Sequence, residues 1–334
     1  MILNRADAEK LIAGFKDTRI LVVGDLMLDR YIFGSVNRIS PEAPVPVVHV
    51  VSEESRPGGA SNVSLNIASL GGISMVAGIA GADKAGEDLL NALTGSGIET
   101  GGVVCSPGLQ TTVKTRIVAD RQQVARVDHE DGVELYADRI EELCGLIPGL
   151  VGKSGAVIIE DYGKGVICQD VVDTVLSAAK EQGKPVGFDP KDNHKLDIPW
   201  LTLATPNYRE ACLATGQPEL PLCESPETGE GLTTAANRLS KQWNSEFLMI
   251  TLGPHGMYLR PRDGHPSVQP TLAKEVFDVS GAGDTVIAVA MMAVSAGAGY
   301  EEAASLANHA AGVVVGKVGT ATCSPDELLN SFKS

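Results

Sequence analysis

The sequence predicts an α/β protein in which helices flank a largely parallel sheet, with a second, smaller sheet beside it. Two observations predict the main sheet. Short apolar runs typical of buried strands recur along the 334 residues, and segments with helical periodicity stand between them. A third observation predicts the second sheet, because two stretches break this rhythm with the alternating pattern of strands that have one solvated face.

The main sheet is predicted to begin with Arg19–Gly24, whose letters RILVVG read as a buried strand. Segments Val171–Gln182 and Thr233–Trp243 carry apolar residues at intervals of three and four, which predicts crossover helices. Gly216–Gly231, with three prolines and several acids, predicts a surface loop. Four later runs repeat the strand pattern, each followed by a polar turn: Val157–Glu160, Pro185–Asp189, Leu201–Thr205 and Phe247–Thr251.

The second sheet is predicted from residues 31–52 and 111–128, where Val113, Thr115 and Ile117 alternate with polar neighbours. These stretches lie far apart in sequence, so they form a lid only if the fold brings them together over the main sheet. Internal repeats and long linkers are absent from the sequence. We therefore expect residues 1–334 to form a single domain with a small β-sheet lid.

Composition excludes several classes of protein. The formal net charge of −15 argues against nucleic acid as the main partner, because binding to a phosphate backbone relies on clustered Lys and Arg. The six cysteines are scattered and the histidines lack metal-ligand spacing, so we expect reduced thiols and no transition metal. The N-terminus resembles no secretory signal and no window reaches the ~18 apolar residues of a membrane span, which predicts a cytoplasmic protein.

The most informative segment is Asp278–Thr285, DVSGAGDT, which leads into a small-residue helix over Val286–Ala296. Glycines at the start of a helix leave backbone N–H groups open to an anion such as a phosphate. Phosphoryl transfer needs stabilised negative charge and a carboxylate beside the incoming hydroxyl. Gly281, Ala282 and Gly283 could supply the first and Asp284 the second. The alternative is that Asp284 only caps the helix.

Together with this segment, Gly58-Gly59-Ala60-Ser61-Asn62-Val63 makes the sequence resemble the ribokinase-like (pfkB) carbohydrate kinase family, whose signatures are a Gly-Gly pair followed by Asn and a later G-A-G-D. Ser280 stands where the family usually has Thr. The resemblance implies a ribokinase-like fold with ATP as phosphate donor, Asp284 as base and the sugar over Gly58 and Gly59. It also implies sugar contacts from Asn62 and Asp29. The alternative for Asn62 is a helix cap after a strand-to-helix turn.

The nucleotide side of the site follows from the same resemblance. Thr205–Glu210 resembles the family's Asn-x-x-Glu element, which implies that Asn207 and Glu210 order Mg²⁺ through its waters. Asn207 could equally be a helix N-cap with Glu210 completing a capping box, and the two roles can coexist. A monovalent cation stays open. The implied ATP-binding residues beyond this element are Thr251, Gly253, Gly256 and Asn308.

Within the family, the run Arg38-Ile39-Ser40-Pro41-Glu42-Ala43-Pro44 resembles the branch that phosphorylates heptose 7-phosphate. The resemblance implies phosphorylation of the anomeric O1 of D-glycero-β-D-manno-heptose 7-phosphate, on the route to ADP-heptose and lipopolysaccharide. A phosphorylated sugar needs cationic partners, although many such charges can be solvated surface groups. The candidate cations are Arg38, Arg56, Lys114, Arg116, Arg121, Arg126, Lys164 and Lys191. Asp189, two positions before Lys191, is a further candidate for substrate binding.

Gly152-Lys153-Ser154 resembles the end of a P-loop, but Ile147 stands where the loop needs glycine, so it receives no phosphate role. The H-x-G-H motif of a fused nucleotidyltransferase is absent, so we expect phosphorylation only. Unpaired edges of the lid sheet favour a homodimer. The alternatives are a kinase of the same fold for fructose or tagatose phosphate and a non-catalytic nucleotide or sugar sensor.

Overall fold

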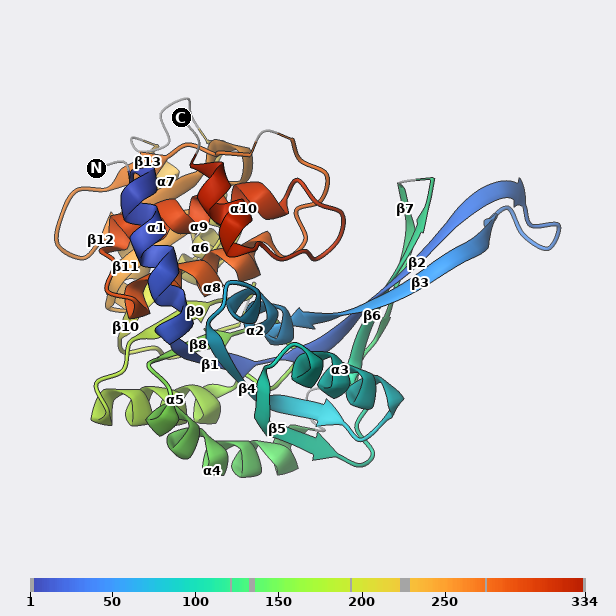
Figure 1. The fold of residues 1–334 in the computed structure, drawn as a ribbon, viewed down its shortest axis with the longest axis horizontal. Helices are drawn as coiled ribbons and strands as arrows, with labels where there is room; N and C mark the ends of the chain where they lie inside the picture. The colour runs from blue at the N-terminus through green and yellow to red at the C-terminus, as the bar shows by residue number, and fades with distance from the viewer. Residues whose placement is uncertain are drawn as a thin grey trace.

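The structure is a computed structural model, which describes residues 3–120, 122–131, 136–192, 194–222, 229–273 and 275–332. A nine-stranded sheet forms its centre, in the order β13-β12-β11-β10-β9-β8-β1-β4-β5 (Figure 1). The strands from β5 to β11 in that order pair in parallel, and β12 and β13 extend the sheet in antiparallel pairing. Their bounds are β1 Arg19–Gly24, β4 Ile73–Gly81, β5 Glu99–Ser106, β8 Ala156–Glu160, β9 Val186–Asp189, β10 Leu201–Ala204, β11 Ser245–Thr251, β12 Met257–Pro261 and β13 Ser267–Gln269.

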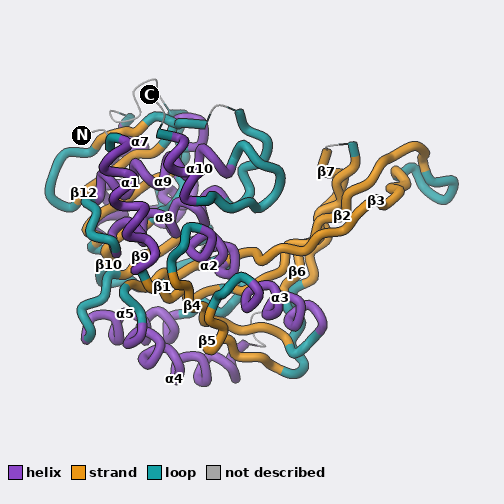
Figure 2. Tube along the Cα trace, in the orientation of Figure 1, coloured by secondary structure: helices purple, strands orange, loops and turns teal. Residues whose placement is uncertain are grey.

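Helices cover both faces of this sheet, so the central strands are apolar on both sides (Figures 1 and 2). This arrangement confirms the strands predicted from continuous apolar runs. One core lies under α1 Arg5–Gly14, α2 Ala60–Ser69, α3 Lys84–Gly95, α8 Ala282–Ser295, α9 Tyr300–Val314 and α10 Pro325–Ser331. The other lies under α4 Ala137–Lys153, α5 Gln169–Glu181, α6 Tyr208–Thr215 and α7 Glu230–Gln242.

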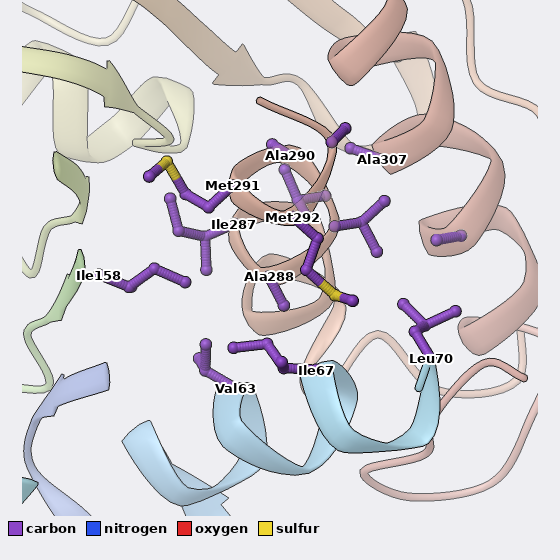
Figure 3. Packing of buried hydrophobic residues seen from close by; sticks show 14 of the residues in the cluster. Val63, Ile67, Leu70, Ile158, Ile287, Ala288, Ala290, Met291, Met292 and Ala307 are labelled. Carbon is purple, nitrogen blue, oxygen red and sulfur yellow. The ribbon is translucent and has the colours of Figure 1, made fainter. Parts of the chain in front are cut away.

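Helix α8 crosses the first of these cores and has no solvent-facing side over Val286–Ala293, where all the side chains are buried. Figure 3 shows Ile287 and Met291 toward Ile158 of β8, with Ile67 of α2 on another side of the helix. A helix that is apolar all round must be surrounded in this way. Its packing places the first turn of α8 beside the carboxyl ends of β8 and β9, the edge at which open α/β sheets bind ligands.

The predicted second sheet is present and has the strand order β3-β2-β6-β7. It consists of β2 Leu26–Ile39, β3 Pro46–Gly59, β6 Thr112–Ala119 and β7 Gln122–His129. The hairpin of β2 and β3 is antiparallel, and β6 joins β2 in parallel, so the two predicted stretches do come together. The sheet extends away from the main body (Figure 1).

Two strands of this lid sheet, β2 and β3, extend nearer to the main sheet than the sequence predicts. In β2 the strand starts at Leu26, and in β3 it continues to Gly59, where Leu26 and Gly59 are register partners. The segments expected to bind sugar are therefore the body-proximal ends of two lid strands. In the predicted loop over Gly216–Gly231, residues 223–228 lie outside the described residues, and α7 begins at Glu230. Across the described ranges, the helices are too short or too polar to span a membrane.

Candidate active site

The first turn of α8 is shaped by glycine. Gly281 is the N-cap, with φ of 78°, a left-handed conformation that favours glycine. A Cβ atom at this position would lie 2.7 Å from Asn62 Nδ2, so space also requires glycine. The N–H of Ala282 donates to Val279 O at 3.2 Å. One of the three backbone N–H groups expected to stabilise negative charge is therefore already partly engaged.

Asp284 lies in this first turn and is only 3% exposed. Its Oδ2 accepts a hydrogen bond from Asn62 Nδ2 at 2.6 Å, and its Oδ1 accepts one from the Tyr162 hydroxyl at 2.6 Å. Burial raises the pKa of Asp284, while these two hydrogen bonds act in the opposite direction. Both carboxylate oxygens are thus held by residues distant in sequence. Among the described residues no side chain caps the start of α8, so the interpretation of Asp284 as a helix cap is wrong.

Tyr162 is a site residue that the sequence analysis missed, although it follows β8 at the sheet edge where ligands bind. Its ring lies between two lysines, with Lys114 Nζ 5.0 Å and Lys191 Nζ 5.6 Å from the ring centroid. Burial lowers the pKa of Lys114 and raises the pKa of Tyr162 well above its ordinary value. The Tyr162 side chain thus connects the Asp284 carboxylate with Lys114 of the lid strand β6 and with Lys191 of the loop after β9.

Two more acids lie beside Asp284 at the ends of adjacent strands. Glu160 ends β8 and Asp189 ends β9, where they are register partners. One carboxylate oxygen from each of Glu160, Asp189 and Asp284 lies within 4.8 Å of the others. Asp189 Oδ1 accepts a hydrogen bond from the Thr205 hydroxyl at 2.5 Å. Glu160 was not predicted as a site residue, because in the sequence it reads only as the last residue of a buried strand.

The expected sugar side is built from the proximal lid. Asp29 is buried and pairs with Arg116, whose Nη1 lies 2.5 Å from Asp29 Oδ1. A Cβ on Gly58 would lie 2.8 Å from Asp29 Oδ2, so glycine is needed for this approach. The neighbouring Asp25 instead accepts from the backbone N–H groups of Tyr162, Lys164 and Val166, which gives it a structural role.

Several predicted cations do not join this group. Arg38 lies nine positions after Asp29 along β2, roughly 30 Å at about 3.3 Å per residue. Arg38 is exposed on the outer part of the lid, so within one chain it lies away from Asp29, and its role in substrate binding stays a prediction. Arg126 is half exposed and pairs with Asp128. Lys164 pairs with Glu130, but it lies near enough to Lys114 to lower, in addition to burial, the pKa of that ammonium group. Arg121 lies outside the described residues.

Most of the predicted nucleotide residues line one cavity of about 280 Å³. Asn308 also lines it, but its Nδ2 donates to Pro270 O at 2.8 Å, so the amide anchors a cavity wall. The apolar lining was missed, because Val276, Val279 and Val315 follow no local pattern that marks a ligand site. The predicted residues in the lining are Thr251, Gly253, Gly256, Ala282, Gly283 and Asn308.

The Asn207–Glu210 pair forms a capping box at the start of α6. Asn207 Oδ1 accepts from Glu210 N at 2.9 Å, and Glu210 Oε2 accepts from Asn207 N at 2.8 Å. Glu210 Oε1 lies 4.0 Å from Lys191 Nζ, and burial raises the pKa of Glu210 to about 6. A parallel bridge joins Asn207 to Thr251 of the cavity wall. One carboxylate oxygen outside the capping box fits contact with a hydrated Mg²⁺.

Solved structures share this fold. The structure of Arabidopsis thaliana ribokinase complexed with ribose and ATP matches with a TM-score of 0.71 and 21% identity, over 95% of this chain and 99% of that one. Escherichia coli phosphofructokinase-2 in complex with potassium matches with a TM-score of 0.72 and 18% identity, over 94% and 98%. The fold is therefore ribokinase-like, as the sequence predicts.

Relatives found by sequence share a higher identity with this chain than these two solved structures do. The bifunctional protein HldE of Geobacter metallireducens is 42% identical over 333 residues, which are 99% of this chain and 66% of that protein. HldE of Halorhodospira halophila is 42% identical over 317 residues, 95% of this chain and 64% of that protein. This chain thus spans about two thirds of these relatives. The profile described as pfkB family carbohydrate kinase matches residues 17–327, and the chain belongs to that family of phosphotransferases.

Proposed function

We propose that this chain phosphorylates the anomeric O1 of D-glycero-β-D-manno-heptose 7-phosphate with ATP, giving the 1,7-bisphosphate for ADP-heptose and lipopolysaccharide biosynthesis. The observation that carries the proposal is the buried Asp284 carboxylate, which lies beside a glycine-rich helix start and next to the cavity that the predicted nucleotide residues line. The choice of sugar is supported by the Arg38–Pro44 run and by the similarity to HldE proteins over nearly the whole chain.

In the proposed reaction, O1 of the sugar attacks the γ-phosphorus and the bond from that phosphorus to the β–γ bridging oxygen breaks. Asp284 takes the proton from O1, and ADP leaves with the bridging oxygen. Negative charge develops on the transferred group beside the start of α8, where N–H groups of Gly281 and Gly283 can stabilise it. Asn62 and Tyr162 keep the carboxylate oriented toward the sugar.

Kinases of this family use ATP with Mg²⁺. When bound, the ion neutralises phosphate charge during transfer. We propose that Glu210 receives the hydrated ion through its Oε1, while Asn207 holds the other oxygen of that carboxylate through its backbone N–H. The capping box thereby orients the acid. Potassium is bound in the structure of Escherichia coli phosphofructokinase-2, and a monovalent cation stays a prediction for this chain.

The sugar phosphate is proposed to bind between the proximal lid and the sheet edge. Asp29, Gly58 and Gly59 face the sugar hydroxyls, with Arg116 holding Asp29 in place. Lys114 and Lys191 flank the Tyr162 ring and have no closer carboxylate partner than 4.0 Å among the ion pairs of the described residues. These two ammonium groups are the best placed to meet the distal phosphate.

The deciding experiment measures ADP release with heptose 7-phosphate, heptose, fructose 6-phosphate and tagatose 6-phosphate as acceptors. We expect the highest kcat/KM with heptose 7-phosphate and at least a tenfold loss without its phosphate, because a charged phosphate contact contributes about 1.5–3 kcal/mol. A preference for another phosphosugar would favour a same-fold kinase of different specificity. ATP binding without ADP release on any acceptor would favour the sensor alternative.

A second prediction concerns the phenol that holds the base. Tyr162→Phe removes a 2.6 Å hydrogen bond to Asp284, and bonds to charged groups are worth about 1.5–3 kcal/mol, so kcat should fall about tenfold. Because that bond lowers the pKa of Asp284, the ascending limb of the pH–kcat profile should move to higher pH. Tyr300→Phe is the matched control, since it removes a hydrogen bond from a tyrosine to the carboxylate of Glu246. Glu246 lies near the start of β11, whereas Thr251 of the cavity lies at its end. An unchanged pH profile in Tyr162→Phe would count against this role.

The remaining expectations are also proposals. We propose a homodimer formed through the lid, supported by apolar side chains that this sheet exposes, and a cytoplasmic location. We propose that residues 1–334 act as one kinase domain. The exposed apolar residues of the lid are Ile39, Val45, Val50, Val51, Val124 and Val127.

A further inference from the structure

Glu160 is a buried acid that the proposed mechanism does not use. It is 0% exposed, and both of its carboxylate oxygens are buried without a hydrogen-bond donor among the described residues. A buried carboxylate is normally surrounded by donors or paired with a cation. Asp25, one strand away, shows the usual solution with three backbone N–H groups. Glu160 requires another explanation.

The surroundings of Glu160 are acidic. Its carboxylate lies within 4.8 Å of oxygens from Asp189 and Asp284, and Asp161 follows it in the chain. Burial raises the pKa of Asp189 well above its ordinary value too, but the Thr205 hydroxyl and Lys191 act on Asp189 in the opposite direction, and Lys114 does so on Asp284. Glu210 adds further negative charge beside Asp189. Three ionised carboxylates at this spacing would repel strongly without water to screen them.

One proton resolves this conflict. Asp189 receives the Thr205 hydroxyl on Oδ1, which leaves Oδ2 as an acceptor, whereas both oxygens of Asp284 already receive donors. Glu160 and Asp189 are register partners at the ends of parallel strands, so their side chains lie on the same face of the sheet. A protonated Glu160 would have a donor for Asp189 and would no longer be an unpartnered buried charge.

We propose that Glu160 is a positioning residue that stays neutral at physiological pH and donates its proton in a hydrogen bond to Asp189. The base Asp284 then has one negatively charged neighbour fewer. Burial, followed by the nearby Asp189 and Asp284 carboxylates, raises the pKa of Glu160 well above its ordinary value, which agrees with this inference. The inference rests on the proposed function only in naming Asp284 as the base.

Infrared spectroscopy tests the protonation directly. At neutral pH the protein should show the carbonyl-stretch band of a protonated carboxylic acid, and Glu160→Gln should remove it. Glu246→Gln, which removes the carboxylate partner of Tyr300 on β11, is the matched control and should leave the band in place. A spectrum in which Glu160→Gln changes no such band would overturn the proposal. This readout does not depend on the sugar or on turnover.

Kinetics tests the positioning role. Glu160→Gln keeps a donor for Asp189 and should turn over at least ten times faster than Glu160→Met, which fills the space without one. The ascending limb of the pH–kcat profile should stay in place in Glu160→Gln, because no charge is lost. A limb displaced to lower pH would mean that an ionised Glu160 had been removed, and equal turnover of the two variants would mean a space-filling role. Either result overturns the proposal.

Calorimetry with Mg²⁺ alone tests the competing use of this acidic group. If the three carboxylates bound a cation, Glu160→Gln would abolish Mg²⁺ binding to the ATP-free protein, and the proposal would fall. Equal Mg²⁺ affinity of the wild type and Glu160→Gln supports it. Failure of the proposed function is distinguishable, because a wrong sugar or base would leave the infrared band and its loss in Glu160→Gln unchanged.

Discussion

Replacing Asp284 by Asn should lower kcat by about 10²–10⁴-fold, the range expected for a positioned general base. The substitution removes the proton acceptor but keeps the shape of the side chain. Asn62 can adapt to the new amide, since its own Oδ1 is buried without a partner among the described residues and a flipped amide would present it as an acceptor. We therefore expect ATP binding and the melting temperature to stay near those of the wild type.

The measurement is steady-state ADP release, together with ATP binding by calorimetry. Asp326→Asn is the matched control, because Asp326 is likewise an acid in the first turn of a helix but is exposed. Its removal should cost only the small interaction of an acid with a helix N-terminus, about 0.3–1 kcal/mol of stability, with no effect on kcat. Turnover of Asp284→Asn close to that of Asp326→Asn would exclude Asp284 as the base.

The second large effect is expected at the helix start. Gly281→Ala introduces a Cβ 2.7 Å from Asn62 Nδ2 in a residue with φ of 78°. Asn62 must then move away from Asp284, and the backbone near the transferred phosphate must shift. Loss of a hydrogen bond to a charged group costs about 1.5–3 kcal/mol, so kcat should fall by at least tenfold.

The same chain offers a control for the backbone part of this effect. Gly297, just beyond the other end of α8, has φ of 89°, and a Cβ there would have no neighbour within 4 Å in the part of the chain that the structure describes. Gly297→Ala carries the same left-handed penalty of roughly 1–2 kcal/mol without a clash. Both variants should therefore melt a few degrees lower, but only Gly281→Ala should lose turnover. A parallel loss of kcat in Gly297→Ala would show that general destabilisation, not the position of Asn62, is responsible.

Local patterns were sufficient to predict five of the nine strands of the main sheet, β1, β8, β9, β10 and β11, and the helix that carries the base. The runs at β1, β8 and β11 are continuous and apolar because both faces of those strands are buried. The start of α8 was predictable from its glycines, although the structure begins the helix at Ala282 rather than Val286. These features depend on residues close together in sequence, and that is the information a pattern contains.

The contacts around Asp284 could not be predicted in the same way. Its carboxylate is held by Asn62, 222 positions earlier, and by Tyr162, 122 positions earlier. Polar residues such as Glu160 and Tyr162 have no periodicity that distinguishes a site from a strand end. The same limit explains Arg38, because the sequence shows its charge but not the length and direction of the hairpin that moves it away from Asp29.

The sequence by itself determined five strands of the main sheet, the position of the helix that carries the base, the family signatures and the identity of the proposed base. Only the tertiary structure decided which distant side chains surround that base, which cations lie close to it and which acid is left without a partner. The physical reason is that burial and charge interactions depend on distance in space, which the packing of α8 against β8, β9 and the lid establishes.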